Sequence, residues 1–285
     1  MVMGAVTVGV GALIVGAAGE TGNSLTIALH AISVATFMAG WNALNDLKDI
    51  GPDKVNRPDR PLPSGAISES AAKNFSIAMM SISALCLAII VWHAERQVGE
   101  AEWMDSVAIW LFALFLMVAY EFDGMPSKVC WKRRGFLGNL SVSGLIAVVI
   151  VFGAASVGHG TDPLPWLVAV CAMMIGTARE IVKDVEDLAG DTDRETLPKK
   201  IGPNPARTLA WILSLLGFIA MALPFGFELL PKGLIIVMLP AMLTLLATKP
   251  PLAKGEDTKA SKFLKRSLML GLAGFTVSGI YASLG

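Results

Sequence analysis

Long apolar runs, each close to the length of a bilayer span, are the feature that most restricts how this chain of 285 residues can fold. Apolar residues make up 54% of the sequence and charged residues 16%, and the mean hydropathy is +0.62. We therefore expect an all-α, polytopic membrane protein. The nine predicted transmembrane helices are 2–19, 24–45, 72–92, 104–120, 136–158, 164–183, 206–228, 232–248 and 262–284.

The basic residues are distributed asymmetrically among the loops between these spans. Of the 23 lysines and arginines, only Arg96 and Lys232 fall outside four loop regions, which follow spans two, four and six and precede span nine. Cytoplasmic loops retain basic residues. The distribution therefore predicts a multi-pass protein of the cell membrane with a cytoplasmic N-terminus and an external C-terminus.

Other bulk properties narrow the classes of function. The formal net charge is zero, so the composition gives no argument for nucleic-acid binding, and no feature implies a protein partner. The three cysteines have no paired spacing, which favours inert thiols over a metal site or a disulfide. The longest polar stretches, 46–71 and 184–205, are too short for a separate soluble domain, and we interpret 1–285 as a single membrane domain.

Two acidic motifs with the same spacing interrupt this apolar chain. They read Asn45-Asp46-x-x-Asp49-x-x-x-Asp53 and Asp184-x-x-Asp187-x-x-x-Asp191. On a helix, positions i, i+3 and i+7 lie within an arc of about 60°, so each motif offers several carboxylate oxygens to one point. Mg²⁺ takes one or two such carboxylates and completes its coordination with water and phosphate oxygens. The motifs therefore predict a diphosphate held by Mg²⁺ on the cytoplasmic side.

The two motifs also resemble an internal repeat. In each, the aspartates are followed in the same order by an arginine, a Leu-Pro pair and a glycine. These are Arg57, Leu62-Pro63 and Gly65 in the first copy, and Arg194, Leu197-Pro198 and Gly202 in the second. Pseudo-twofold repeats in membrane proteins place a shared site at the interface between the halves. We therefore expect span two to pack against span six and the motifs to form two walls of one site.

Two other interpretations of the acidic motifs must be weighed. Acidic residues beside basic ones at a membrane surface usually form solvated ion pairs of little energetic weight, but identical spacing in two copies favours a bound metal diphosphate. A cation-coupled transporter would also carry paired carboxylates, near the middle of its spans. The motifs lie instead at the ends of spans and are followed by arginines, which favours phosphate binding.

The chain resembles a known family in several of these segments. The paired motifs, the nine-span pattern and the run 56–65, Asn-Arg-Pro-Asp-Arg-Pro-Leu-Pro-Ser-Gly, resemble the UbiA-type intramembrane prenyltransferases. Within that superfamily, 132–140 and 179–191 look most like the archaeal digeranylgeranylglyceryl phosphate synthases. The resemblance implies a helical bundle around a central cavity that opens laterally to lipid and is capped by the cytoplasmic loops.

The function implied by this resemblance is a Mg²⁺-dependent transfer of a geranylgeranyl group. The donor would be geranylgeranyl diphosphate, and the acceptor would be the free glycerol hydroxyl of geranylgeranylglyceryl phosphate, a step in archaeal ether-lipid synthesis. The alternative within the superfamily is a prenyltransferase for an aromatic ring, a quinone precursor or a chlorophyll-like acceptor. The substrates would then be a prenyl diphosphate and a lipid-phosphate or aromatic acceptor.

The site residues follow from the two motifs and the basic residues near them. Two Mg²⁺ ions would be held by Asp46, Asp49, Asp184 and Asp187, with Asp53 and Asp191 as further candidate ligands. Two amides, Asn42 and Asn45, would orient these ligands. The phosphate groups would meet Arg57, Arg60, Lys128, Lys132, Arg133 and Lys183.

A proline affects the geometry of the first motif. Pro52 lacks an amide hydrogen and disfavours a helical residue before it, so the helix that carries Asp46 and Asp49 should end or bend near Ile50. Asp53 is then expected to point away from the other two aspartates.

The topology leads to a direct test. Reporters fused after Gly65 and Lys200 should both report a cytoplasmic location, and reporters fused near Gly99 and Gly160 should report an external one, because the basic loops stay inside. The measurement is the activity of a compartment-specific reporter in cells. Opposite sides for the loops at 65 and 200 would separate the two acidic motifs and exclude a common site.

Overall fold

The computed structural model describes residues 2–97, 104–123, 130–188 and 195–284, and the elements within these ranges are helices. The α-helices are α1 (Val2–Ile14), α2 (Asn23–Lys48), α3 (Ile50–Asn56), α4 (Glu69–Gln97), α5 (Met104–Glu121), α6 (Phe136–Ala155), α7 (Pro163–Glu186), α8 (Leu197–Ile201), α9 (Pro203–Gly226), α10 (Leu239–Leu246), α11 (Lys249–Lys254) and α12 (Asp257–Leu284). Two 3₁₀ helices complete the order, η1 (Trp131–Arg133) and η2 (Lys232–Met238).

Eight segments in the described ranges are long and apolar enough to cross a membrane, so the all-helical, multi-pass fold is confirmed while the count of nine is not. They correspond to predicted spans two to nine. The first predicted span, 2–19, contains α1, which has only 13 helical residues, fewer than the approximately 20 that cross a bilayer.

The eighth span is broken where the sequence predicted a continuous helix over 232–248. Its 23 residues, Lys232–Lys254, form η2, α10 and α11 in succession. Prolines explain the breaks, because each removes a backbone donor and fits best in the first turn of a helix. Pro240 lies in the first turn of α10, and Pro250 and Pro251 lie in the first turn of α11.

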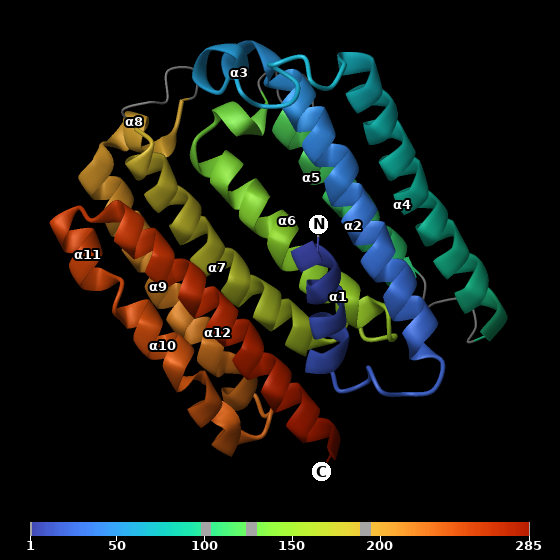
Figure 1. Ribbon diagram of the computed structural model, residues 1–285. Helices are drawn as coiled ribbons and strands as arrows, with labels where there is room; N and C mark the ends of the chain where they lie inside the picture. Colours follow the sequence, from blue (N-terminus) through green and yellow to red (C-terminus); the bar gives the residue numbers. More distant parts are fainter. Residues whose placement is uncertain (1, 98–103, 124–129, 189–194, 285) are drawn as a thin grey trace.

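The helices pack side by side with the two acidic motifs at the same end of the bundle. Figure 1 shows α2 and α7 rising to the upper end, where α3 and α8 lie. α2 packs chiefly on α4 and α1, whereas α7 packs chiefly on α9 and α6. The expected direct packing of span two on span six is therefore wrong. α6 contacts both α2 and α7 and stands between them.

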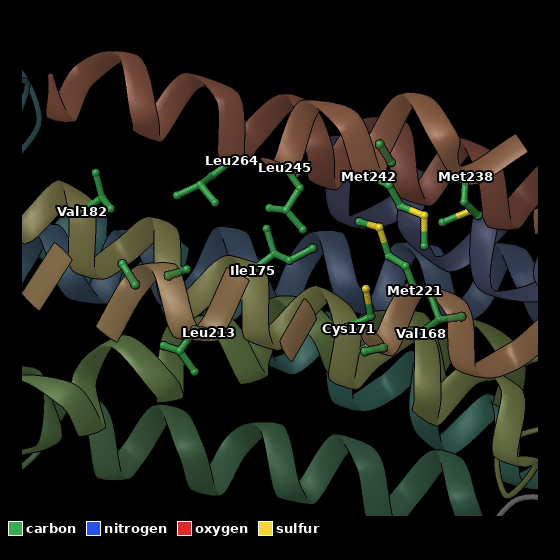
Figure 2. Close-up of a cluster of buried hydrophobic side chains, with 14 of the residues drawn as sticks. Val168, Cys171, Ile175, Val182, Leu213, Met221, Met238, Met242, Leu245 and Leu264 are labelled. Atoms are coloured by element: carbon green, nitrogen blue, oxygen red, sulfur yellow. The ribbon is translucent and has the colours of Figure 1, made fainter. Parts of the chain in front are cut away.

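The bundle has two halves, the first formed by α1 to α6 and the second by α7 to α12. The second half has a filled apolar core. Ile175 and Val182 of α7, Met221 of α9 and Leu264 of α12 are almost completely buried and belong to one cluster that extends along these helices (Figure 2). Polar contacts fasten the same helices at the end that carries the acidic motifs. Arg207 of α9 donates two hydrogen bonds, of 2.8 and 2.7 Å, to the carboxylate of Asp257 at the start of α12.

Close backbone contact holds α1 against its neighbours. A Cβ atom at Gly153 of α6 would overlap the Val8 carbonyl oxygen, and one at Gly11 would overlap the carbonyl oxygen of Ile150. On the other side of α1, a Cβ at Gly279 of α12 would overlap the carbonyl oxygen of Ile14. Small residues let helices in a membrane approach closely and gain van der Waals contact. α1 thus links α6 to α12, beside the direct packing of α6 on α7.

A substitution at this contact tests its contribution. Gly153→Ala should lower the free energy of unfolding by about 1–3 kcal/mol, the cost of overpacking a tight contact. Thermal unfolding in detergent micelles is the measurement. Gly9→Ala is the matched control, because nothing lies within 4 Å of a Cβ at that position and alanine favours a helix. Equal stability of the Gly153 variant and the control would contradict the close contact.

Candidate active site

The ammonium group of Lys132 is the centre of a charged cluster at the end of the bundle that carries both acidic motifs. Its Nζ atom lies 2.8 Å from Asn45 Oδ1 and 2.8 Å from each carboxylate oxygen of Asp49. A fourth oxygen, Glu121 Oε1, lies 3.6 Å away. An ammonium has three hydrogen-bond donors and no acceptor. Lys132 therefore draws together oxygens from two helices.

Three elements bring these side chains together. Asn45 and Asp49 lie on the last turn of α2 and at its C-cap, Glu121 is the last residue of α5, and Lys132 lies in η1. A hydrogen bond from the Cys130 N–H to Asp123 Oδ1 positions the start of η1, and it lowers the pKa of the Asp123 carboxyl below its ordinary value.

Glu121 is a site residue that the sequence did not reveal. At the end of an apolar run it resembles an ordinary surface carboxylate, yet its side chain is only 3% exposed. Lys48 donates a hydrogen bond of 3.0 Å to the backbone carbonyl of Glu121 and covers the ring of Phe122. The only signal in the sequence is a carboxylate at a span end, which a membrane protein also uses at its surface.

The helix breaks within the first motif, close to the position that Pro52 predicted. α2 ends at Lys48 and α3 begins at Ile50, with Asp49 between them. The carboxylate of Asp53 is nearly buried and accepts a hydrogen bond of 2.7 Å from Arg60. The same Arg60 Nη1 atom lies 3.6 Å from Asp46 Oδ1. Arg60 therefore contacts two aspartates of the first motif, and the expectation that Asp53 points away from the others is wrong for Asp46, which shares this arginine with it.

The second motif lies at the end of α7. Asp184 is in the last turn of this helix and the exposed Asp187 is its C-cap. One turn earlier, Glu180 accepts hydrogen bonds from Lys183 at 2.8 Å and from Arg179 at 2.9 Å. Two further predicted site residues lie outside the described residues. They are Asp191 of the second motif and Lys128, which precedes η1 in the chain.

The segment with Lys132 also reaches the second half of the bundle. Gly135 follows η1 with a φ of +56°, and a Cβ there would lie 3.0 Å from the backbone nitrogen of Leu197, the first residue of α8. α8 follows the second acidic motif in the chain. The segment from Lys132 to Gly135 therefore contacts the first motif with its side chain and the region after the second motif with its backbone.

The donor atoms at this end suit a hard cation that is shared with a phosphate. Carboxylate and amide oxygens are the ligands that Mg²⁺ prefers, and Mg²⁺ needs only one or two protein carboxylates beside phosphate. Within 2–97, 104–123, 130–188 and 195–284, no group of three or more histidine, cysteine, aspartate or glutamate residues is close enough to hold a metal by itself. The arrangement fits a metal bound with its substrate better than a preformed metal cage.

A cavity of about 390 Å³ extends from this charged end into the apolar interior of the first half. Residues of α1, α2, α5 and α6 line it. Asn42, Asn45 and Tyr120 form its polar end, and the remaining wall is apolar apart from Thr7 and the indole nitrogens of Trp41 and Trp110. A volume of this size is typical of sites for small molecules. The cavity and the Lys132 cluster share Asn45, so an apolar chain inside would present its polar end to the charged residues.

The other predicted phosphate-binding residues lie near the same end. Arg57 immediately follows α3, and Arg133 lies beside Lys132 in η1. Both side chains are exposed. They are therefore accessible to an anionic group that approaches the cluster from outside.

Comparisons with known proteins identify the family to which this chain is related. The model of the UbiA prenyltransferase family matches residues 4–270. A digeranylgeranylglyceryl phosphate synthase of Methanopyrus kandleri is 32% identical over 282 residues, which cover 97% of this chain and 94% of that protein. A protein of the same name from Methanosarcina mazei is 33% identical over 242 residues, or 84% of this chain and 77% of that protein.

Solved structures have the same fold. One, described as digeranylgeranylglyceryl phosphate synthase in membranes, superposes with a TM-score of 0.77 at 25% sequence identity and covers 98% of this chain and 94% of its own. An apo structure of a UbiA homologue from Aeropyrum pernix K1 superposes with a TM-score of 0.70 at 18% identity, covers 100% of this chain and 98% of its own, and supports the fold alone.

The Lys132 cluster predicts a coupled effect on stability. Lys132→Met should lower the free energy of unfolding by about 1–3 kcal/mol in metal-free buffer, because Glu121 and Asp49 lose a charged partner. Adding Glu121→Gln should restore part of that loss by removing the nearly buried charge, a non-additivity that a double-mutant cycle of thermal unfolding measures. Arg133→Met, at the neighbouring exposed cation, is the control. Additive effects of the two substitutions would contradict a direct interaction.

Proposed function

The chain belongs to the UbiA prenyltransferase family, and on that premise we propose that it transfers a geranylgeranyl group from geranylgeranyl diphosphate to the free glycerol hydroxyl of geranylgeranylglyceryl phosphate. The observation that carries the proposal is the apolar cavity that ends at Asn45, beside Lys132 and Asp49. A prenyl chain fits the apolar part, and its diphosphate then meets the charged end. The curated relatives at 32% and 33% identity, both digeranylgeranylglyceryl phosphate synthases, favour this acceptor.

The aspartates of the two motifs would hold the diphosphate through Mg²⁺. We assign Asp46 and Asp49 to one side of the diphosphate and Asp184 and Asp187 to the other, in line with their common end of the bundle (Figure 1). When bound, Mg²⁺ neutralises the negative charge that develops on the departing diphosphate. Asp53 is the weaker candidate of the first motif, because its side chain is only 12% exposed, against 53% for Asp46 and 32% for Asp49.

The basic residues would bind two anionic groups, the diphosphate of the donor and the phosphate of the acceptor. Lys132 would donate to the diphosphate, because its ammonium contacts Asp49, one of the carboxylates that would hold the metal. The exposed Arg57 and Arg133 are candidates for the phosphate of the acceptor. Asn42 and Asn45 lie where the cavity becomes polar and would orient the reacting end of the prenyl chain.

The apolar wall of the cavity would keep water away from the reacting carbon of the prenyl chain. Cleavage of the bond between the allylic carbon and the diphosphate oxygen leaves a cation that water would capture. Few polar groups line the cavity between Asn42 and its deep end, so little water would be held there. The glycerol hydroxyl of the acceptor would then be the nucleophile that reaches the cation. The hydroxyl oxygen then forms the new ether bond to the allylic carbon and loses its proton.

We also propose that the charged end faces the cytoplasm. The asymmetric distribution of lysine and arginine supports a cytoplasmic N-terminus in the cell membrane, and the motifs lie with the basic loops. In this orientation both anionic substrates present their phosphate groups to the aqueous side from which Mg²⁺ arrives. The acidic motifs occupy the end of the bundle and not its middle, which argues against a cation-coupled transporter (Figure 1).

An assay of acceptors tests the proposed function. Purified protein with geranylgeranyl diphosphate and Mg²⁺ should prenylate geranylgeranylglyceryl phosphate and leave aromatic acceptors unchanged, because the exposed basic residues favour a phosphorylated acceptor. Product formation followed by mass spectrometry is the measurement. Prenylation of an aromatic acceptor, with none of the glycerol phosphate, would replace this proposal with the aromatic alternative.

Single aspartate substitutions test the two-sided model of the metal site. Asp46→Asn and Asp187→Asn should each lower turnover by a hundredfold or more, about 3 kcal/mol, because each removes a charged ligand while almost preserving the volume. Thermal unfolding should be nearly unchanged. Asp162→Asn, at the N-cap of α7 at the opposite end of the bundle, is the matched control. Normal turnover of either motif variant at ordinary Mg²⁺ concentrations would contradict the model.

A further inference from the structure

The deep end of the cavity is closed by one aromatic ring. The lining residues of α6 extend from Val142, nearest the charged end, to Phe152. This separation of ten residues corresponds to about 15 Å along a helix. Phe152 is 3% exposed, and Val34 of α2 and Ile109 of α5 line the cavity at the same depth.

A buried histidine supports this ring from behind. The ring centroids of His30 and Phe152 lie 4.5 Å apart, and His30 is 1% exposed and is not part of the cavity wall. Phe152 therefore separates the cavity from His30, so a chain in the cavity reaches Phe152 before it reaches His30.

Both ring nitrogens of His30 are hydrogen-bonded, which fixes the orientation of the imidazole. Nδ1 lies 2.7 Å from the carbonyl oxygen of Thr26, and Nε2 lies 2.8 Å from the hydroxyl of Ser106 on α5. A carbonyl only accepts, so Nδ1 carries the hydrogen and Nε2 accepts from the serine. A ring held at both nitrogens cannot turn aside without losing a buried hydrogen bond.

We propose that Phe152 sets the maximum length of the prenyl chain that the donor can place in the cavity, and that His30 is the positioning residue that holds it there. The inference rests on the proposed function, and it identifies the donor by chain length. A longer chain would have to displace the ring of Phe152 into the space that His30 fills. Dense packing resists such a displacement, because neighbouring side chains have no free volume into which to move.

Donor chain length is the measurement that tests the proposal. Phe152→Ala should raise the ratio of kcat/KM for geranylfarnesyl diphosphate, which is one isoprene unit longer, to that for geranylgeranyl diphosphate. We expect a change of at least about tenfold, the smallest discrimination typical of one misplaced methylene in an apolar pocket. Phe152→Trp should shift the preference toward farnesyl diphosphate, which is one unit shorter. The two variants therefore move the ratio in opposite directions.

The control is a buried phenylalanine of the other half. Phe225 of α9 is 2% exposed and stacks on Phe275 of α12, with ring centroids 6.2 Å apart, and neither residue lines the cavity. Phe225→Ala should lose stability without changing the ratio. If Phe152→Ala does not fold, Phe152→Leu supplies a smaller side chain at a lower cost in packing.

Substitutions behind the ring test the role of His30. His30→Leu removes both hydrogen bonds but keeps an apolar side chain of similar size, and it should shift the ratio in the same direction as Phe152→Ala, by a smaller factor. A merely structural histidine would lower stability and leave the ratio unchanged. Ser106→Ala, which removes one of the two hydrogen bonds, should have an intermediate effect.

Two outcomes would overturn the proposal. An unchanged donor ratio in folded Phe152 variants would mean that the chain leaves the cavity before its deep end. If the Phe152 variants instead changed the preference among acceptors of different chain length, and left the donor ratio unchanged, the cavity would be assigned to the acceptor. Failure of the proposed function itself is distinguishable, because the unmodified protein would then transfer none of the three prenyl groups.

Discussion

The confinement of charge to the ends of an apolar bundle, with most basic residues at the end that carries the acidic motifs, is the constraint on which the rest of the structure depends. A hydrocarbon environment offers no partners to polar groups, so the chain either buries them in pairs or gathers them at the surface. Lys132 collects oxygens from α2 and α5 at that end, and Arg207 binds Asp257 between α9 and α12. The Lys132 cluster also adjoins the polar end of the cavity, because Lys132 donates a hydrogen bond to the lining residue Asn45.

The two halves of the bundle use their interiors differently. In the first half, α1, α2, α5 and α6 enclose a cavity of about 390 Å³, whereas α7, α9 and α12 pack around a core filled by residues such as Ile175, Met221 and Leu264. An unfilled cavity lowers the stability of the first half, because its lining residues lose packing contacts. A bound substrate would restore those contacts. The filled half supplies a firm support for the second acidic motif, which Thr258 also holds through Glu186 at 2.6 Å.

Apolar periodicity and length were sufficient to predict most of the membrane fold, because lipid imposes one pattern on every span. They were insufficient where tertiary contacts decide. Pro240 and the prolines at 250 and 251 break the eighth span. The repeated motifs correctly suggested a common end, but nothing in their spacing indicated that α6 would stand between α2 and α7. Glu121 and Phe152 owe their importance to neighbours distant in the sequence, so no local pattern marks them.

The position of Lys132 has a consequence for the protein between catalytic cycles. An ammonium within 2.8 Å of both oxygens of Asp49 acts as a built-in counter-ion, so this carboxylate is neutralised before any substrate arrives. Binding of the proposed Mg²⁺ at Asp49 would then be an exchange of partners, and its affinity would be the difference between the new contacts and those that Lys132 gives up. Lys132 therefore reduces the repulsion between Asp49 and the neighbouring Glu121 when no substrate is bound.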